Sequence, residues 1–464
     1  MSMQEPQYVV PRIDIIEQPA VNNNPPAVVN MGRIGLVGTF SWGPVGVPIH
    51  GYSEEWFESQ LGDYEAGLTG WLSMHGIFMQ NATQDVTVIR IAGASAKQAS
   101  GTFNDANNNP SAVVTALYPG DKPISVSWQA GTNPNTVKLI VIADGTSQTY
   151  DNLTLTNFNT VVDPNVSVAA AQGATALPAP IASTPLEGGD PGADAQDTDY
   201  VNGLNLLANV PVHIVLCAQQ SSTTVQAALL ALGANNSVGN GLAFPVLNMP
   251  EGDDQEAIVT AMESVQGIRG VVASPWGTFD DLPGVTVATD GHYAGVLANI
   301  SAWYSPSNQT VQGLSSLQNS YSDDDVYDLT VARVSPITLD PLTGNYIIRN
   351  GVSTFVMPEN GDSDDWSQIN VRREFDNLET GIYVGTQWAK SSVDPNLPTQ
   401  LATWIDNFLL TAKKNQEITD YQPTTAYRDS TNQRRVVTSI SVQPLYAADF
   451  IDNYVAQWSG ATSS

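Results

Sequence analysis

A regular alternation of apolar and amphipathic segments between residues 200 and 279 constrains the fold most strongly. Three apolar runs are typical of buried strands: VPVHIVLCA (210–218), LAFPVLNMP (242–250) and RGVVASPWGTF (269–279). The segments between them, 223–236 and 253–266, have the composition of helices, and the second begins with acidic residues that favour the helix macrodipole. Strand–helix–strand succession of this kind predicts a largely parallel sheet covered by helices.

The regions on either side of this alternation have different characters. Residues 33–49 combine a buried-type strand with a Trp-Gly-Pro turn, and residues 86–93 read as a strand. Helices are predicted between them at 52–61 and 70–80. From 98 to 190, short strand-like pieces are separated by Asn, Pro, Gly and Asp, which predicts an all-β insertion. Its far edge, 174–199, is low in complexity and is interpreted as loop or linker.

Two later segments can be interpreted from their residues. The acidic run SDDDVYD at 322–328 lacks the spacing and glycine of a calcium-binding EF-hand loop, so we interpret it as a solvated loop. ITLDPLTGNYIIR at 337–349 is typical of a hairpin. With 464 residues, the chain is too long for one ordinary core. We predict a multidomain protein of the α/β (α+β) class.

Charge and composition exclude several functions. The formal net charge is −29, whereas a sequence-independent nucleic-acid binder needs positive charge to neutralise phosphates. The sequence contains no run of about 18 apolar residues, so no membrane span is predicted. The N-terminus lacks a signal-peptide pattern. Cys217 is the one cysteine and is expected to be a buried small hydrophobe. The sequence has no Cys/His cluster for zinc and no phosphate-binding glycine motif, so we predict no metal and no cofactor.

Four stretches together resemble the contractile tail sheath proteins of bacteriophages and related injection machines. The most recognisable is INVRREFDNLETGIYVGTQW at 369–388. The others are GLVGTFSWGPVGVPI at 35–49, VVASPWGTFDDLPGVTVATDGHYAGVLAN at 271–299, and RRVVTSISVQPLYAADFI at 434–451. They span most of the chain apart from the 98–190 insertion.

The resemblance implies a division into domains. Residues 1–30 would form an N-terminal arm and linker. Residues 31–97 and 350–464 would form an inner assembly domain that ends in a C-terminal arm. Residues 191–349 would form a middle α/β domain, and the β-rich insertion at 98–190 would protrude outward.

The resemblance also implies a function. Subunits of this family form stacked hexameric rings around a tail tube and contract to drive the tube through the host envelope. The implied partners are other copies of the chain, the tail tube protein, and the baseplate and tail terminator proteins, with no direct nucleic-acid contact. The implied location is the virion tail, assembled in the host cytoplasm. A sheath of a phage-derived injection particle is the nearest alternative.

The resemblance gives a meaning to the extended segment YVVPRIDIIE at 8–17, which precedes a Pro-rich linker. From its residues alone, this segment either folds back or adds to the sheet edge of another subunit. The family exchanges arm strands between neighbours, so the second reading is implied, and 448–456 would supply the matching strand. The expected arm residues are Tyr8, Val10, Ile13, Ile15, Phe450, Ile451, Tyr454 and Val455.

Basic residues near the C-terminus are candidates for contacts between subunits. Arg372 and Arg373 are either surface ion pairs of little energetic value or partners of a neighbour's carboxylates. The expected charged contacts are Arg372, Arg373, Glu374, Arg434 and Arg435. Lys413 and Lys414 either complement the C-terminus of their own helix or face an acidic tube.

A hydrolase is the alternative from a different class, since the central region of the family is described as subtilisin-like. None of the four histidines (His50, His75, His213 and His292) stands in a catalytic context, and no serine nucleophile segment is present. His213 alternates within an apolar strand, and His292 is expected to have a packing or turn role. We therefore predict no enzymatic activity.

Overall fold

The computed structural model describes residues 31–235, 238–356, 366–448 and 454. Within these ranges the chain forms two compact units. The larger contains residues up to Thr380 together with the residues from Pro444 onward, and the smaller contains Gly381–Gln443. Helices and several separate sheets occur together, which confirms the predicted mixed, multidomain class.

A nine-stranded sheet forms the centre of the larger unit, in the order β16-β19-β18-β13-β12-β11-β1-β3-β2. Its six inner strands from β18 to β3 run parallel, while β2, β19 and β16 at the two ends pair antiparallel. The bounds are β1 Ile34–Thr39, β2 Pro48–Gly51, β3 Val86–Ile91, β11 Ile214–Cys217, β12 Phe244–Asn248, β13 Val271–Ser274, β16 Thr310–Val311, β18 Ser335–Leu339 and β19 Tyr346–Ile348. The parallel sheet predicted from the alternation is confirmed.

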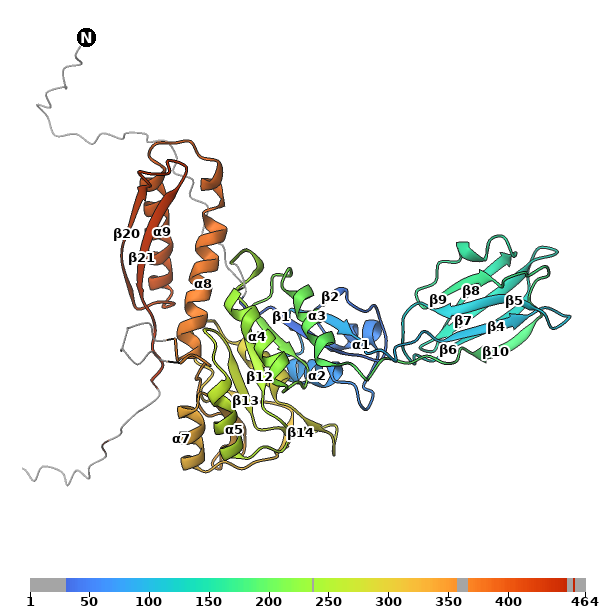
Figure 1. The fold of residues 1–464 in the computed structure, drawn as a ribbon, viewed down its shortest axis with the longest axis horizontal. Helices are drawn as coiled ribbons and strands as arrows, with labels where there is room; N and C mark the ends of the chain where they lie inside the picture. Colours follow the sequence, from blue (N-terminus) through green and yellow to red (C-terminus); the bar gives the residue numbers. More distant parts are fainter. Residues whose placement is uncertain (1–30, 236–237, 357–365, 449–453, 455–464) are drawn as a thin grey trace, which may run out of the picture. The chain divides into compact units, whose positions relative to one another are not determined.

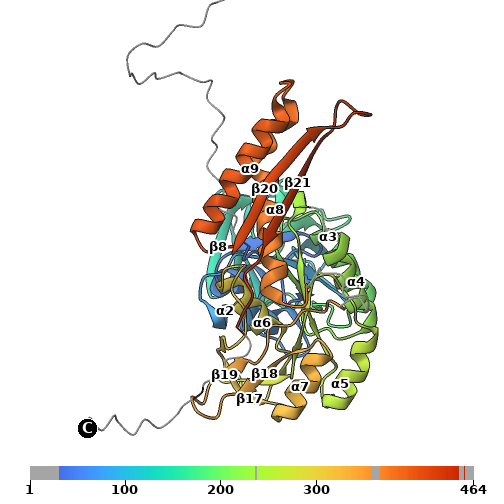
Figure 2. The same cartoon turned by 90° about the vertical axis from the view of Figure 1, so that its left-hand side faces the viewer.

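Helices cover both faces of this sheet, which explains why its strands are continuous apolar runs. Along β1, Ile34 and Leu36 enter one buried cluster while Val37 enters the other. The first cluster contains residues of α1, α2 and α6, and the second contains residues of α3, α4, α5 and α7 (Figures 1 and 2). The bounds are α1 Glu54–Leu61, α2 Gly70–Gln80, α3 Asp197–Leu207, α4 Thr223–Asn235, α5 Gln255–Ala261, α6 Asp290–Asn299 and α7 Asp323–Val331.

Helix α7 corrects the interpretation of 322–328 as a solvated loop. Ser322 and Asp325 form a capping box: the Ser322 hydroxyl accepts from the Asp325 backbone N–H, and the Asp325 carboxylate accepts from the Ser322 N–H at 2.8 Å. The three aspartates of the first turn also lie where the helix dipole favours negative charge. The same residues that make the run look solvated therefore start a helix.

The β-rich insertion is confirmed as two antiparallel sheets, β4-β5-β9 and β10-β6-β7-β8 (Figure 1). They enclose a cluster of their own around Trp128, Leu139 and Phe158. The bounds are β4 Ser100–Asn104, β5 Pro110–Ala116, β6 Ile124–Ala130, β7 Val137–Ala143, β8 Thr146–Leu153, β9 Val166–Ala170 and β10 Ile181–Pro185. Strand β10 and the start of α3 both lie inside the segment interpreted as loop or linker at 174–199.

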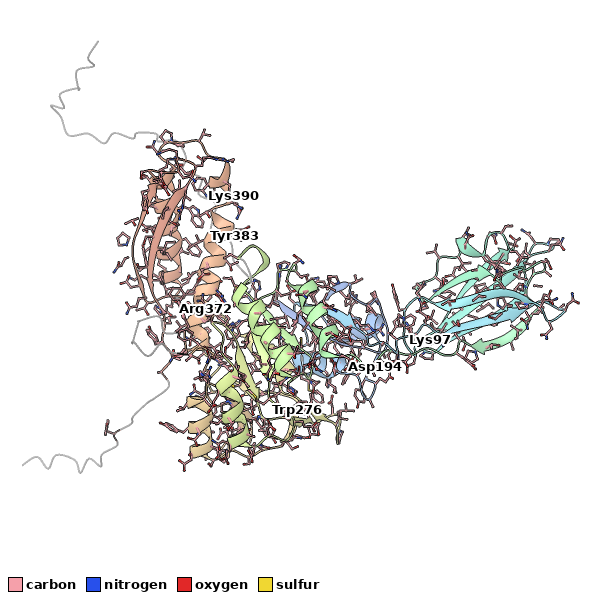
Figure 3. All side chains as sticks on the ribbon, in the orientation of Figure 1. Lys97, Asp194, Trp276, Arg372, Tyr383 and Lys390 are labelled. Carbon is pink, nitrogen blue, oxygen red and sulfur yellow. The ribbon has the colours of Figure 1, made fainter. Side chains whose placement is uncertain are left out.

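The two chain segments that enter and leave the insertion are hydrogen-bonded to each other. Lys97 and Asp190 exchange backbone hydrogen bonds of 2.9 Å, and Ser100 and Glu187 exchange bonds of 2.9 and 3.2 Å. The Asp194 carboxylate accepts a bond of 2.7 Å from the Ser95 hydroxyl. Lys97 and Asp194 are marked at this junction in Figure 3.

The predicted separation of 31–97 from 191–349 does not match the sheet. Strand β1 lies between β11 and β3, so both segments contribute to one hydrophobic core. A further three-stranded sheet, β15-β14-β17, contains β14 Gly277–Phe279, β15 Thr286–Val287 and β17 Leu314–Leu317. The division implied by the resemblance assigns the two segments to different domains, whereas the sheet joins them across the insertion.

Candidate assembly interface

The smaller unit is built from a helix packed on a two-stranded sheet. Helix α9 spans Leu397–Lys414, and β20 (Asp420–Arg428) pairs antiparallel with β21 (Val436–Gln443). Apolar residues recur every three or four positions along α9, from Leu401 and Ile405 to Leu409, and these are buried. Figures 1 and 2 show α9 lying along the β20–β21 ribbon.

The β20–β21 sheet has two open edges. Among the described residues, no third strand pairs with either β20 or β21. Exposed positions alternate with half-buried ones along the second half of β21, as expected for a sheet covered on one face only. An isolated two-stranded sheet is marginally stable, and an open edge is a template for another strand.

A groove of about 800 Å³ lies beside this sheet, within the smaller unit. Its apolar lining includes Ile382, Leu401 and Ile405, and its basic lining includes Lys390, Arg428 and Arg434. The Lys390 ammonium lies 5.0 Å from the centre of the Tyr383 ring; both residues are labelled in Figure 3. The groove combines an apolar surface with positive charge, which suits an extended segment that carries carboxylates.

The charge of the smaller unit sets it apart from the rest of the chain. Residues 381–443 contain six Lys and Arg and five Asp and Glu, a net charge of +1. The remaining residues contain eleven Lys and Arg and 41 Asp and Glu, a net charge of −30. Repulsion between copies of such an acidic chain is therefore weakest at this unit.

The first turns of α8 (Ile369–Gly385) hold a buried ionic network in the larger unit. Arg372 donates to Asp376 at 2.7 Å and to Glu379 at 3.1 Å, and its guanidinium lies 4.2 Å from the centre of the Trp366 ring. Arg269 donates to the same Asp376 carboxylate at 2.9 Å. Figure 3 labels Arg372 on this helix.

Arg373 and Glu374 are also buried. Arg373 donates to the Leu297 carbonyl at 2.8 Å, and burial lowers the pKa of this guanidinium to about 10. Glu374 accepts from the Leu445 backbone N–H at 3.1 Å. The expectation that Arg372, Arg373 and Glu374 are surface charges is corrected, because α8 turns all three inward; contact with a neighbouring subunit stays a prediction.

The same helix fixes the chain just before the predicted C-terminal arm. Asn370 donates to the Leu445 carbonyl at 2.8 Å, and Gln368 accepts from the Ala447 N–H at 3.3 Å. Together with Glu374, these residues bind the backbone that follows β21. The most recognisable motif of the sequence therefore holds the base of the C-terminal segment.

The other predicted residues lie at the surface or outside the described ranges. Lys413 donates to Asp420 at 2.7 Å, Lys414 is exposed, and Arg435 lies 3.6 Å from Asp429 at the β20–β21 turn. Arg434 and Tyr454 are exposed. The remaining arm residues, Tyr8, Val10, Ile13, Ile15, Phe450, Ile451 and Val455, lie outside the described residues.

The carboxyl edge of the parallel sheet is where an α/β enzyme would bind a ligand. Here the Asp290 carboxylate, at the first residue of α6, occupies that position. It is fully buried and accepts bonds of 2.7 Å from the Ser73 hydroxyl, 2.8 Å from the Asn248 amide and 2.9 Å from the Gln219 N–H. Burial raises its pKa, although these hydrogen bonds oppose the shift. The edge is closed by the chain's own carboxylate.

The histidines do not form a nucleophile–base pair in the part of the chain that the structure describes. No histidine ring there bonds to a serine, threonine or cysteine side chain: His50 pairs with Asp85, and His75 with Glu54 and Asp281. His213 and His292 are buried, and burial lowers their pKa values to about 4 and about 3. Cys217 is buried, as predicted.

Metal-binding clusters and membrane-spanning helices are both absent from the described ranges. No cluster of three or more His, Cys, Asp or Glu side chains there is arranged to bind a metal ion. Within the same ranges, no helix is long and apolar enough to cross a bilayer.

Comparison with known proteins identifies the fold. No family model matches the chain, and no curated protein matches it. A sheath tail protein from Listeria innocua matches with a TM-score of 0.71 at 15% identity, over 90% of this chain and 92% of that one. A sheath tail protein from Desulfitobacterium hafniense has a TM-score of 0.68 at 13% identity, over 94% and 100%.

A third similar structure comes from an assembled particle. The helical sheath of the anti-feeding prophage in its contracted state has a TM-score of 0.58 at 14% identity, over 97% of this chain and 99% of that one. All three structures match 90% or more of this chain and of their own chain. The chain has the fold of the contractile tail sheath proteins, the family that its sequence motifs resemble.

Proposed function

We propose that the chain is a structural, non-enzymatic subunit of a contractile tail sheath. It polymerises as stacked hexameric rings around a tail tube and contracts to drive the tube through a host envelope. The observation that carries the proposal is the match, along almost all of both chains, with a protein from a helical, contracted sheath. The chain then works in the tail of a virion, with the tube, baseplate and terminator proteins as partners.

Strand exchange is the proposed link between subunits. Residues 8–17 and 448–456 of neighbouring copies add to the open edges of β20 and β21. Backbone hydrogen bonds supply the attachment, and the basic side chains of the groove attract the carboxylates of Asp14 and Glu17. The open edges, the net charge of +1 and the anchored base at Leu445 support this link.

Charged contacts follow from the same proposal. Arg434 and Arg435, at the exposed turn between β20 and β21, pair with carboxylates of a neighbour. Lys414 faces the tube, and Lys413 does so if its bond to Asp420 opens. Glu374 acts between subunits through the C-terminal segment whose base it helps to hold. Arg372 and Arg373, which bond within their own subunit, act there only by holding α8 in place.

Electron microscopy of the negatively stained, purified chain at high concentration tests the function. Hollow, striated cylinders with sixfold end views are expected. Because some sheaths need a template, the same sample is imaged with purified tube protein. Discrete monomers at every concentration, with and without the tube, would overturn the proposal.

The sheath of a genome-free injection particle is the second candidate, favoured by the match with the anti-feeding prophage sheath. Particles isolated from the native source distinguish the two functions. A capsid filled with DNA above the sheath supports a phage tail, whereas capped tails without a capsid support an injection particle.

A further inference from the structure

We propose that His75 is a pH-sensitive latch: its doubly protonated ring ties helix α1 to the turn between β14 and β15, and the tie opens when the ring loses a proton. This inference does not depend on the sheath function. It concerns a cluster of side chains that lies outside the smaller unit and takes no part in the proposed strand exchange.

The bonding geometry requires both ring nitrogens to donate. His75 lies on α2, and its Nδ1 is 2.5 Å from Glu54 Oε1 while its Nε2 is 3.1 Å from Asp281 Oδ2. Ionised carboxylates only accept hydrogen bonds, and a neutral imidazole has only one N–H. A neutral ring would therefore point a lone pair at one of the two carboxylates. Only the imidazolium satisfies both.

The surroundings hold the ring in place and favour its charge. Trp71 stacks on His75 with ring centres 4.4 Å apart and an angle of 16° between the planes, a position in which a π face attracts a cation. Phe279 meets the ring edge-on at 4.8 Å. The Trp71 indole donates to Glu58 at 2.9 Å, which fixes the stacked ring to α1.

The other charged or titratable groups near His75 do not replace it in the latch. On α6, His292 packs behind Phe279 with ring centres 5.2 Å apart, and burial together with the charge of His75 lowers its pKa to about 3. Asp290 has its carboxylate bonded to Ser73, Asn248 and Gln219. Glu58, on α1, bonds to Trp71. Thus His75 alone carries the proton that joins Glu54 and Asp281.

The direction of the pH effect follows from the pKa of His75. Burial disfavours the charged ring, but the hydrogen bonds and negative charges of Glu54 and Asp281 outweigh burial and raise the pKa above its ordinary value of 6.5. A raised pKa means that the stabilisation is complete below the ordinary value and is lost as the pH rises through the raised value. The latch is therefore closed below the ordinary value of 6.5 and opens as the pH rises through the raised pKa of His75.

Nuclear magnetic resonance of the full chain, with only histidine labelled with ¹⁵N, tests the protonation state. With four histidines, the His75 signals can be assigned by their loss in His75→Gln. Both His75 nitrogens should be protonated at pH 6, while His292 should stay neutral. In Asp281→Asn, which keeps the side-chain shape, the His75 midpoint should fall by about one pH unit or more. A His75 midpoint at or below 6.5 in the full chain would overturn the proposal.

Hydrogen exchange measured by mass spectrometry tests the release. Exchange of residues 280–285, corrected for the intrinsic effect of pH, should accelerate as the pH passes through the His75 midpoint. In His75→Gln it should be fast at every pH, and peptides of β12 serve as the internal control. Exchange at 280–285 that does not follow the His75 titration would show that the charged ring does not hold the turn between β14 and β15. That result would overturn the latch.

Discussion

The buried carboxylate of Asp376 joins two segments of the chain that are far apart in the sequence. Arg269 and Arg372 both donate to it, and all three side chains are buried. Exposed ion pairs contribute little, but a buried charge that loses its partner is strongly unfavourable. Arg269 comes from the loop before β13, more than a hundred residues away in the sequence, so the carboxylate joins α8 to the central sheet.

Replacement of this carboxylate should be costly. Asp376→Ala leaves two guanidinium groups buried without their shared partner and should lower the free energy of unfolding of the larger unit by about 3–5 kcal/mol. Denaturation by urea, followed by circular dichroism, measures the loss. Asp323→Ala is the control, because Asp323 forms an exposed pair with Arg349. An equal effect of the two substitutions would contradict a structural role for the network.

At the scale of elements, the contact between α8 and α9 depends on glycine. Within the smaller unit, a Cβ added at Gly385 would lie 2.0 Å from Cη2 of Trp404, and one at Gly381 would lie 2.7 Å from Cζ of Phe408. Trp404 and Phe408 stack with ring centres 5.6 Å apart. The two glycines, four residues apart, therefore leave the end of α8 without side chains where the Trp404 and Phe408 rings pack against it.

A methyl group at this contact should disrupt it. Gly385→Ala gains up to about 1 kcal/mol of helix propensity, but overpacking typically costs 1–3 kcal/mol, so we expect net destabilisation. Hydrogen exchange of residues 381–414 should accelerate. Thr403→Ala, on the exposed face of α9, is the control and should leave exchange unchanged. Unchanged exchange in Gly385→Ala would mean that the contact accommodates the added methyl group, which would contradict the need for glycine there.

Elements were predicted well where local pattern determines them. The structure confirms the strands and helices predicted at 210–279 and the strands predicted in the insertion. These predictions succeed because buried strands and amphipathic helices differ in the period of their apolar residues. Helix α7 was missed because Ser322 and Asp325 look like loop residues unless their spacing is recognised as a capping box. The bond between Arg269 and Asp376 and the bond between His75 and Asp281 could not be predicted, since these partners lie 107 and 206 positions apart and only the fold brings them together.

At the scale of the whole molecule, charge and arms act together. An acidic chain whose net charge outside residues 381–443 is −30 should not aggregate through random contacts. Specific attachment then depends on the smaller unit, with its open edges and basic groove. The proposed arms would direct assembly to this unit.

Deletion of residues 1–20 tests the arms in the intact subunit. The truncated chain should be folded, with an unchanged circular dichroism spectrum, but should not polymerise where the full chain does. Sedimentation velocity and electron microscopy measure polymerisation. Deletion of residues 1–6, which keeps Tyr8 to Glu17, is the matched control and should assemble normally. Cylinders formed equally well by both deletions would refute strand exchange by the N-terminal arm.

The paired backbone at the base of the β-rich insertion has a consequence for how the molecule folds and varies. Because Lys97 bonds to Asp190 and Ser100 to Glu187, the chain returns to its starting point after the insertion. For the central sheet, the insertion is thus equivalent to a short connection, because its two ends are held together. The entropy lost in closing this long loop is offset by the packing of the insertion's own core. Domains of other sizes could therefore replace the insertion between Lys97 and Asp190 without a change in the register of β1, β3 and β11.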